Sequence, residues 1–338
     1  MLRLPELDIH QPHTLEAALG ILAQHGADAR VLSGGTDLLP NTKLRQTQAK
    51  HLISVRYLPE LAGVELQEAQ LRIGGNTTLA NVAEDELVRK FLPALAFAVG
   101  RIASPQIRRM GTLAGNLCLD TRCRYINQSE LWREALGGCL KSHGNECHVV
   151  PGGQGCVAAL SSDSVPVLIA YGAEVELAKI GSVRRLPVAD LYDADGLNHV
   201  NKQPDEVLTA VYIPLPNAQT HVVYRKWAVR KSIDFPLVSV ALRLEMDKRQ
   251  DSDIHQVLGG LIAVGVLGPR PRVLGLEKLQ GRLVDESLAQ TLGQMAFDRC
   301  RPLPNVPYEA EYRRERLATE VRRAVRVLAG LPEHARPT

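Results

Sequence analysis

The sequence predicts a mixed α+β protein of two domains, and three observations lead to this prediction. Strand-like and helix-like segments alternate in the first part of the chain, with paired glycines where a strand gives way to a helix. A proline-rich stretch over residues 213–221 is typical of a domain boundary. Beyond it, strand-like segments precede a helical C-terminus. We therefore expect one domain over residues 1–220 and a smaller α+β domain over residues 221–338, since 338 residues exceed one ordinary core.

The first domain begins with an amphipathic helix. Leu15, Leu19 and Leu22 recur at helical spacing on one face, and Thr14 is placed to cap the N-terminus. Later elements follow from short apolar runs and turn residues. The expected ones are strands over residues 30–33, 71–73 and 165–178, a helix starting near Thr78, and a helix over residues 91–99.

The second domain reads as three strands followed by a helix. The strands are expected over residues 222–229, 237–246 and 257–266. The helix has its apolar face at Leu317, Val321, Ala324 and Leu328. Arginines near the C-terminus are expected on its polar, solvated face: Arg313, Arg314, Arg316, Arg322, Arg323 and Arg326.

Composition excludes several classes of protein. A formal net charge of +3 argues against a nucleic-acid or membrane-surface partner. The longest apolar run, residues 258–267, is too short to span a bilayer, and the N-terminus lacks a signal-peptide core. We therefore expect a cytoplasmic protein. In that compartment disulfides are disfavoured, and clustered cysteines more often bind metal.

The cysteines are crowded. Five of the six lie between Cys118 and Cys156, and Cys300 is remote. The absence of any C-x-x-C pair excludes a zinc ribbon and a bacterial ferredoxin run. Thiolates from such a loop-rich segment suit a 4Fe–4S cluster or a structural zinc, where His143 and His148 could substitute. Unligated thiols are the third alternative.

Two loops of small residues could bind an anion. Residues 33–37 directly follow a strand, so their backbone N–H groups can approach a phosphate. The loop is neither G-x-G-x-x-G nor a P-loop. Residues 111–116 form a second such loop. Each loop alone is equally an ordinary turn, but together they indicate nucleotide binding.

Several motifs occur in a characteristic order: residues 33–37, 102–108, 111–116, 224–226 and 234–236. Together they resemble the FAD-binding medium subunits of the xanthine dehydrogenase and carbon monoxide dehydrogenase family. The resemblance covers nearly the whole chain. It implies an α+β medium-subunit fold, with two α/β subdomains that bind FAD and a C-terminal α+β domain.

The chain departs from this family by an insertion of roughly forty residues, about 120–160. It separates Asn116 from Ser162-Asp163, which the family places close together. The insertion resembles that of 4-hydroxybenzoyl-CoA reductase β subunits, a subgroup with an extra 4Fe–4S cluster. The resemblance implies that Cys123, Cys139, Cys147 and Cys156 ligate such a cluster. Cys118 and Cys300 are then packing residues.

The resemblance also implies a set of FAD contacts. Residues of the first loop would hold the pyrophosphate: Leu32, Ser33, Gly34, Gly35, Thr36 and Asp37. A second wall would comprise Gly111, Thr112, Gly115 and Asn116, and Ile102 would also contact the cofactor. Asp163 and Lys226 match an acidic and a basic flavin-site residue.

The function implied is electron transfer, with no catalytic residue in this chain. A reduced ferredoxin would supply electrons to the 4Fe–4S cluster and FAD. They would pass to a small 2Fe–2S subunit and a molybdopterin-containing large subunit, in a dimer of heterotrimers. The large subunit would reduce 4-hydroxybenzoyl-CoA to benzoyl-CoA. The charge of the insertion is balanced between four basic and four acidic residues, so it gives no electrostatic support for ferredoxin docking.

Two alternatives remain at this level. The first is an FAD subunit of a molybdenum hydroxylase, acting on an N-heterocycle or aldehyde, with structural zinc in the insertion. The second is a scaffold subunit without flavin.

Overall fold

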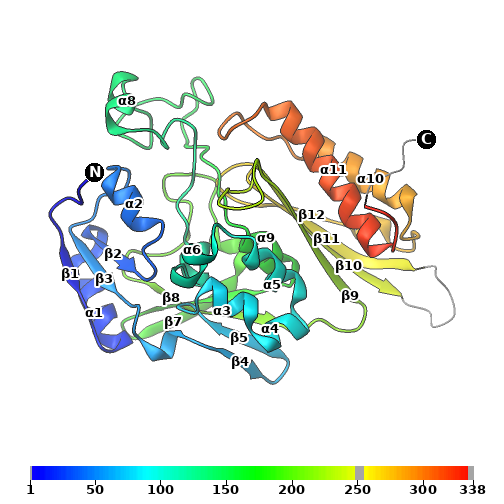
Figure 1. Cartoon of the computed structure of the whole chain (residues 1–338), viewed down its shortest axis with the longest axis horizontal. Helices are drawn as coiled ribbons and strands as arrows, with labels where there is room; N and C mark the ends of the chain where they lie inside the picture. The colour runs from blue at the N-terminus through cyan, green and yellow to red at the C-terminus, as the bar shows by residue number, and fades with distance from the viewer. Residues whose placement is uncertain (1, 248–254, 334–338) are drawn as a thin grey trace.

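The protein is described by a computed structural model that covers residues 2–247 and 255–333. Its strands form three sheets, and Figure 1 shows the small one beside the N-terminal helix. The small parallel sheet has the order β1 (Asp8–His10), β3 (His51–Ser54), β2 (Ala29–Leu32). The five-stranded antiparallel sheet has the order β4 (Val64–Gln67), β5 (Gln70–Gly74), β8 (Val207–Pro214), β6 (Glu174–Lys179), β7 (Ser182–Pro187). The four-stranded antiparallel sheet has the order β12 (Arg272–Gly275), β11 (Gln256–Gly265), β10 (Val238–Asp247), β9 (Thr220–Trp227).

The N-terminal helix confirms its prediction. It is α1 (Leu15–His25), and the Thr14 hydroxyl accepts a hydrogen bond from the Ala17 N–H at 3.2 Å. Leu19 and Leu22 are buried in a core that includes Ile53 of β3. This small core fixes the sheet from which the first small-residue loop departs.

Short helices fill the space between the sheets. They are α2 (Leu38–Lys43), α3 (Leu79–Glu84), α4 (Glu86–Phe91), α5 (Pro93–Gly100), α6 (Pro105–Met110), α7 (Leu113–Leu117) and α9 (Ser164–Ala170). Elsewhere in the described residues, 3₁₀ turns lie between α1 and β2, between β3 and β4, between β7 and β8, and after β12: Gly26–Asp28, Pro59–Leu61, Val188–Leu191 and Glu277–Leu279. Helix α3 begins directly after Thr78, close to the expected start, and the Thr78 hydroxyl caps it by accepting from the Asn81 N–H. Across residues 2–247 and 255–333, no helix has the length and apolar character needed to cross a membrane.

The predicted strand over residues 165–178 is wrong in its first half. Residues Ser164–Ala170 form α9, whose seven residues are all buried, and only Glu174–Lys179 form strand β6. A short run that is apolar all round cannot be assigned by periodicity, because a buried helix and a buried strand look alike. Gly172, with φ of 70°, makes the turn between them.

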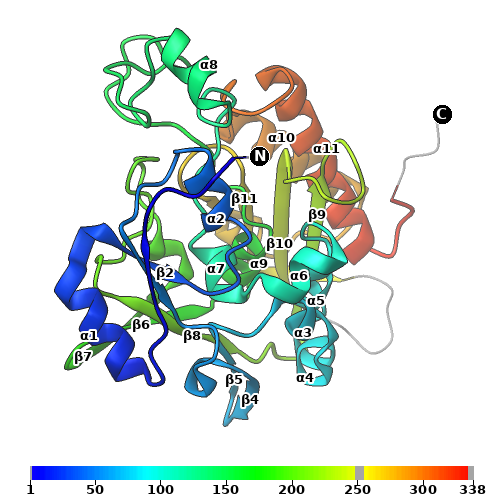
Figure 2. The ribbon, with the colours of Figure 1, turned by 60° about the vertical axis from the view of Figure 1, so that its left-hand side comes forward.

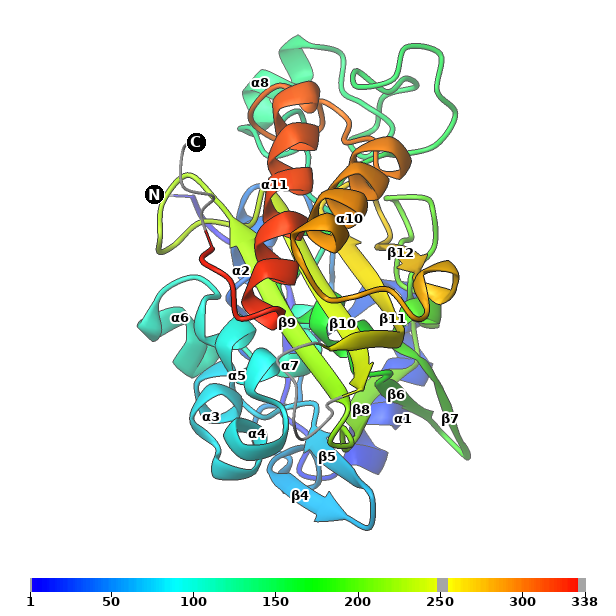
Figure 3. The same ribbon diagram turned by 90° about the vertical axis from the view of Figure 1, so that its right-hand side faces the viewer.

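Helices α10 (Glu286–Arg299) and α11 (Ala310–Leu328) pack together over one face of the four-stranded sheet, as Figure 3 shows. Leu317, Val321 and Ala324 lie in the shared core, which confirms the predicted apolar face. The three predicted strands are β9, β10 and β11. The sequence analysis missed β12 and α10. The division of the chain at residues 220 and 221 stays a prediction, because α9 packs against β10 and β11.

Arg313 contradicts the expected solvated arginine face. Its side chain is fully buried, and burial lowers the pKa of the guanidinium to about 10. It donates to the backbone carbonyls of Leu237, Val266 and Leu303 at 3.1, 2.6 and 2.8 Å. Five N–H donors in one planar group can satisfy carbonyls that strands leave unpaired at their ends. Arg313 therefore ties α11 to the sheet from inside.

The insertion is mostly irregular, and its helix is α8 (Glu130–Ala135). It projects from the rest of the chain in Figures 1 and 2. Arg133 anchors it, donating to the backbone carbonyl of Leu44 at 2.7 Å. On the other side, the Arg124 N–H donates to the carbonyl of Asn305 at 2.7 Å. Both contacts use backbone carbonyls, so the insertion is held by the framework at two points.

Replacing Glu286 by Gln should reduce stability in a pH-dependent way. Hydrogen bonds from Arg326 at 2.6 and 2.7 Å lower the pKa of Glu286 to about 2, below its ordinary 4.5. Its contribution is therefore present above pH 4.5 and is lost as pH falls toward about 2. Because the carboxylate is half exposed, the loss at neutral pH should be at most about 1 kcal/mol.

Urea unfolding at about pH 6 and about pH 3 measures this effect. The stability difference between the wild-type protein and the variant should be clearly smaller at the lower pH, though not yet zero, because about pH 3 is still above the folded pKa of about 2. Glu311→Gln is the matched control, because that carboxylate lies 3.5 Å from Arg314 on an exposed face. An equal loss at both pH values would contradict the role given to the Glu286 carboxylate.

Candidate functional site

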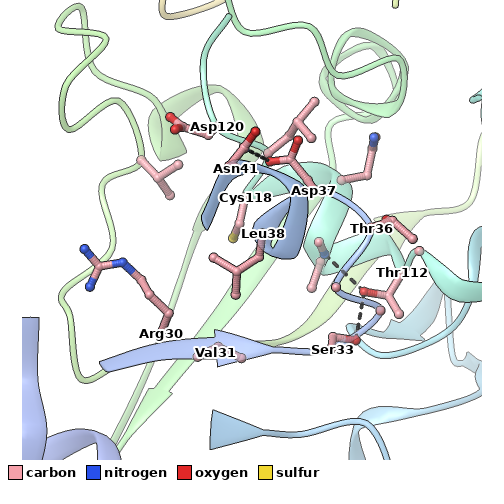
Figure 4. A pocket seen from close by; sticks show the side chains of 18 of the residues that line it. Arg30, Val31, Ser33, Thr36, Asp37, Leu38, Asn41, Thr112, Cys118 and Asp120 are labelled. Atoms are coloured by element: carbon pink, nitrogen blue, oxygen red, sulfur yellow. Dashed lines mark hydrogen bonds between the residues drawn. The ribbon is translucent and has the colours of Figure 1, made fainter. Parts of the chain in front are cut away.

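A cavity of about 960 Å³ lies between the small sheet, the five-stranded sheet and the root of the insertion. Figure 4 shows part of its lining, in which Ser33 lies next to Thr112 and Asp37 lies further along the first loop. We call it the loop cavity, because loops 33–37, 75–78 and 111–116 supply one side of it. Its size is at the upper end of ordinary ligand pockets.

The first loop carries the chain from β2 to α2. A Cβ at Gly34 would overlap the backbone carbonyl of Met110, so only glycine fits here. Gly35 follows with φ of 68°, a conformation that favours glycine. The two glycines thus let the first loop lie directly against the start of the third.

The three loops are joined by backbone and side-chain hydrogen bonds. The Ser33 hydroxyl lies 3.2 Å from the Thr112 hydroxyl oxygen, to which it donates. The Ala114 N–H donates to the Gly75 carbonyl, and the Leu79 N–H donates to the Gly111 carbonyl, each at 2.9 Å. These bonds fix the position of the loops relative to one another before any ligand binds.

Asn116 links the third loop to the segment after the insertion. Its side-chain carbonyl accepts from the hydroxyls of Ser162 and Ser164, both at 2.7 Å. All three side chains are buried. The forty inserted residues therefore begin and end at nearly the same place, which is why the framework can tolerate them.

Asp163 is buried at the wall of the cavity with two partners. It accepts from the Tyr224 hydroxyl at 2.5 Å and from the Lys226 ammonium at 3.0 Å. Burial raises the pKa of Asp163, and Lys226 opposes that rise. The same burial, with the carboxylate beside it, raises the pKa of Tyr224. Asp163 thus lines the cavity as a carboxylate whose charge is paired with that of Lys226.

Most of the residues predicted to contact FAD meet in this cavity. Those that line it are Ser33, Gly34, Gly35, Thr36, Asp37, Ile102, Gly111, Thr112, Gly115, Asn116 and Asp163. Leu32 ends strand β2 beside the loop, and Lys226 lies behind Asp163. Neither of these two residues lines the cavity. Their geometry is compatible with the predicted roles, which stay predictions.

Sequence reasoning missed Arg122. Its guanidinium lies 2.7 Å from the Asp37 carboxylate and 3.9 Å from the centre of the Phe235 ring. Burial raises the pKa of Asp37, and Arg122 opposes that rise. Within the part of the chain that the structure describes, the buried Nε of Arg122 has no hydrogen-bond partner. Phe235 belongs to the motif over residues 234–236, but no local pattern pointed to Arg122.

The four insertion cysteines come from separate turns and face a common region. Cys123, Cys147 and Cys156 are buried, and Cys139 is half-buried. The charges of Cys156 and Cys139 add to the rise that burial causes in the pKa of Cys123. The charges of Cys139 and Cys147 do the same for the pKa of Cys156. Among the described residues no three of these sulfur atoms lie within 4.8 Å. The thiols therefore converge, but they are more widely spaced than around one zinc ion, where about 3.8 Å separates them.

Backbone N–H groups point at two of these thiols. Burial raises the pKa of Cys123 to about 11, while the N–H groups of Tyr125 and Ile126 lower it. Burial likewise raises the pKa of Cys156, opposed by the Ala158 N–H. N–H donors aimed at sulfur favour a thiolate, the form that binds metal.

The insertion also forms part of the cavity wall. Lys141 lines the cavity and donates to Asp120, Thr121 and the Gly196 carbonyl at 2.7, 2.8 and 2.7 Å. Gly196 in turn packs on Cys156, where a Cβ would lie 2.9 Å from the sulfur. The cysteine region and the cavity therefore share one wall.

The two remaining cysteines lie elsewhere. Cys118 is half-buried and lines the cavity, and burial raises the pKa of its thiol. Cys300 is buried in the C-terminal core and directly follows α10. Neither position contradicts its assignment to packing.

The cavity fits a flavin dinucleotide on three counts. Its volume is large, glycine-rich loops line it, and the buried Nε of Arg122 has no hydrogen-bond acceptor among the described residues. An anionic pyrophosphate would satisfy such donors.

Comparison with known proteins identifies relatives. A family model described as an FAD-binding domain in molybdopterin dehydrogenase matches residues 5–216. The FAD-binding subunit of an aldehyde oxidoreductase from Escherichia coli K12 is 36% identical over 242 residues, 69% of this chain and 75% of that one. The medium chain of a carbon monoxide dehydrogenase from Hydrogenophaga pseudoflava is 25% identical over 321 residues, covering 95% and 96% of the two chains.

Solved structures share the fold. A chain of quinoline 2-oxidoreductase from Pseudomonas putida 86 superposes with a TM-score of 0.78 at 22% identity, covering 97% of this chain and 98% of that one. A chain of a Cu,Mo-dependent CO dehydrogenase gives 0.77 at 24% identity, with 97% and 99% covered. These likenesses confirm the predicted α+β medium-subunit fold.

Replacing Gly34 by Ala should destabilise the protein by about 1–3 kcal/mol, because the new Cβ has no room beside the Met110 carbonyl. The loops must separate to admit it, so bound flavin per chain should also fall. Urea unfolding and flavin absorbance measure the two effects. Gly20→Ala is the control, because nothing lies within 4 Å of that helical position. Wild-type flavin content in the Gly34 variant would contradict the role of the loop contact.

Proposed function

The chain belongs to the family of FAD-binding domains in molybdopterin dehydrogenases, and from this premise we propose how its insertion serves electron transfer. It is an oxidoreductase FAD subunit of the molybdenum hydroxylase family. Our proposal is that the loop cavity holds the FAD and that the four insertion cysteines hold a 4Fe–4S cluster beside it. The chain is then an electron-transfer subunit with a second redox centre, through which electrons enter or leave the flavin.

The residues of the loop cavity support the flavin part of the proposal. Backbone N–H groups of residues 33–36 would hold the pyrophosphate, and Arg122 would add a charged donor beside it. Asp163, neutralised by Lys226, would face the cofactor without leaving a free buried charge. When bound, FAD supplies the ability to take up and release electrons singly or in pairs.

The chemistry of the insertion supports an iron–sulfur cluster. Four thiols form a soft, all-sulfur donor set, which selects zinc or iron–sulfur centres. Their spacing favours the larger occupant, because a single zinc ion would have to draw the loops closer together. N–H donors near Cys123 and Cys156 are the kind of contact that tunes cluster potentials.

The observation that carries the proposal is the shared wall. Lys141 lines the loop cavity, while its partner Gly196 touches Cys156. A redox centre bound by the cysteines would therefore be separated from the cavity by little more than these residues. Short separation is what an electron-transfer subunit requires, and a purely structural site has no need of it.

The partners in this proposal follow the family resemblance. A molybdopterin-containing large subunit and a small 2Fe–2S subunit would complete the enzyme in the cytoplasm, as a dimer of heterotrimers. As the first candidate we propose reductive dehydroxylation of 4-hydroxybenzoyl-CoA, with ferredoxin as donor. The insertion motif supports this candidate, and its balanced charge does not add to that support.

A second candidate is aldehyde oxidation, with electrons leaving through the insertion. The observation in its favour is the 36% identity to an aldehyde oxidoreductase FAD-binding subunit, over 69% of the chain. In this candidate the cluster occupies the same cysteines, whereas a structural zinc there would leave the insertion without an electron-transfer role. The two candidates differ in the direction of electron flow, which an assay can separate.

Replacing Cys139 by Ser should remove the cluster with little effect on folding. Cys139 is the least buried of the four thiols, so serine costs little packing. Protein purified anaerobically should contain about four iron and four sulfide per wild-type chain, and far less in the variant. Flavin content should stay at the wild-type level. Metal analysis measures the iron, an acid-labile sulfide assay measures the sulfide, and visible absorbance measures the flavin.

Cys300→Ala is the matched control, because that cysteine lies in the remote C-terminal core and should leave iron unchanged. Zinc without iron in the wild type would overturn the cluster and favour a structural site. Wild-type iron in the Cys139 variant would overturn the ligand assignment. A complex without flavin absorbance after gentle purification would point to a scaffold.

Assays of the intact complex should distinguish the two candidate reactions. With a low-potential reductant, the first candidate expects conversion of 4-hydroxybenzoyl-CoA to benzoyl-CoA. With an electron acceptor, the second expects oxidation of an aromatic aldehyde. The Cys139 variant should lose exchange with the external electron partner in either case. Reduction of its FAD by substrate should be retained only if electrons flow outward.

A further inference from the structure

Three histidines converge at the edge of the small sheet, away from the loop cavity. His10 ends β1, His25 ends α1 and His51 begins β3, so three separate elements bring them together. All three are half-buried, and none lines the cavity. Neither the FAD proposal nor the cysteine proposal uses them.

Their geometry is close to that of a metal site. One ring nitrogen from each residue can be chosen so that all three lie within 4.8 Å of one another. The rings of His25 and His51 lie 3.7 Å apart between centroids, and His10 lies 5.3 and 5.5 Å from His51 and His25. A tetrahedral zinc ion with Zn–N bonds of 2.0–2.1 Å holds its ligand nitrogens about 3.3 Å apart. Small side-chain rotations would bring the three nitrogens from within 4.8 Å of one another to this shorter spacing.

A carboxylate stands beside the three rings. Asp8 pairs with His51 in the register of β1 and β3, and its Oδ2 lies 3.4 Å from the His51 Nδ1. The same nitrogen lies 3.2 Å from the His10 Nε2. Asp8 therefore lies on the same side of the His51 ring as His10, where its negative charge favours a bound cation.

We propose that His10, His25 and His51 bind a divalent transition-metal ion, with Asp8 as a supporting carboxylate. Imidazole nitrogen suits zinc, copper and nickel, whereas calcium and magnesium require oxygen ligands. Imidazole coordinates a metal ion in its neutral form, so binding is favoured at neutral and alkaline pH. Solvent can supply the remaining ligand at this half-buried site.

The ion would act as a cross-link. It joins β1 and α1 to β3, the middle strand of the small sheet. Strand β1 has three residues, so few backbone hydrogen bonds hold it. A ligand that binds only the folded state raises stability in proportion to the logarithm of its concentration over Kd. The site would therefore hold the N-terminal segment against the domain that carries the first small-residue loop.

Calorimetric titration of the full chain with Zn²⁺, at about pH 7.5, tests the proposal. Wild-type protein should bind one ion more than the His25→Gln variant, with micromolar or tighter affinity. His10→Gln and His51→Gln should each weaken that site by at least about tenfold, and Asp8→Asn should weaken it by a smaller factor. The melting temperature of the wild type should rise with zinc, and that of the His25 variant should rise less.

His13→Gln is the matched control, because this exposed histidine lies on the segment between β1 and α1 outside the cluster. It should bind zinc like the wild type. Circular dichroism and flavin content should be unchanged in all variants, which shows that each is folded. Equal zinc stoichiometry and affinity in the wild type and the His25 variant would overturn the proposal, as would affinity weaker than about 100 μM.

The insertion cysteines also bind metals, so the titration needs a spectroscopic partner. Titration with Co²⁺ distinguishes the sites, because thiolate ligation adds strong near-ultraviolet charge-transfer bands that imidazole ligation lacks. The His25→Gln variant should lose the imidazole site's share of the visible cobalt absorption and keep the thiolate bands. The Cys139→Ser variant should show the opposite pattern. Loss of the thiolate bands alone in the His25 variant would overturn the proposal and leave the iron–sulfur proposal untouched.

Discussion

The close approach of Gly34 to the Met110 carbonyl is the contact on which the loop cavity depends. It brings the first loop against the third, where Ser33 meets Thr112. The second loop joins them through the Gly75 carbonyl. Three chain segments thus meet with their backbones exposed to one cavity. A Cβ at Gly34 or Gly75 would collide with the neighbouring backbone and displace the loop that carries it, so glycine is required for their close approach.

The insertion adds to this framework without disturbing it. It leaves after the third loop and returns at the serines that Asn116 binds. Arg133 and Arg124 attach it to backbone groups on either side, and Lys141 makes it part of the cavity wall. An added segment placed this way can give a flavin subunit a second redox contact while its core packing stays the same.

Local patterns predicted the regular elements well where one face of an element is polar. The cap at Thr14, the helix start near Thr78 and the apolar face of α11 are confirmed. The prediction failed for α9, because a segment buried on all sides has no periodicity to read. It failed for Arg313 because an arginine on an amphipathic helix ordinarily faces water. Here unpaired carbonyls at the ends of strands draw it inside.

The sequence by itself determined the glycine loops, the grouping of the cysteines and the likeness to FAD-binding medium subunits, because each is written in contiguous or closely spaced residues. Only the tertiary structure decided which distant side chains meet. Arg122 reaches Asp37 across 85 positions, and His10 reaches His51 across 41. Such pairs depend on strand register and on where the insertion folds back. No local pattern encodes that, because the contacts exist only after separate segments have packed.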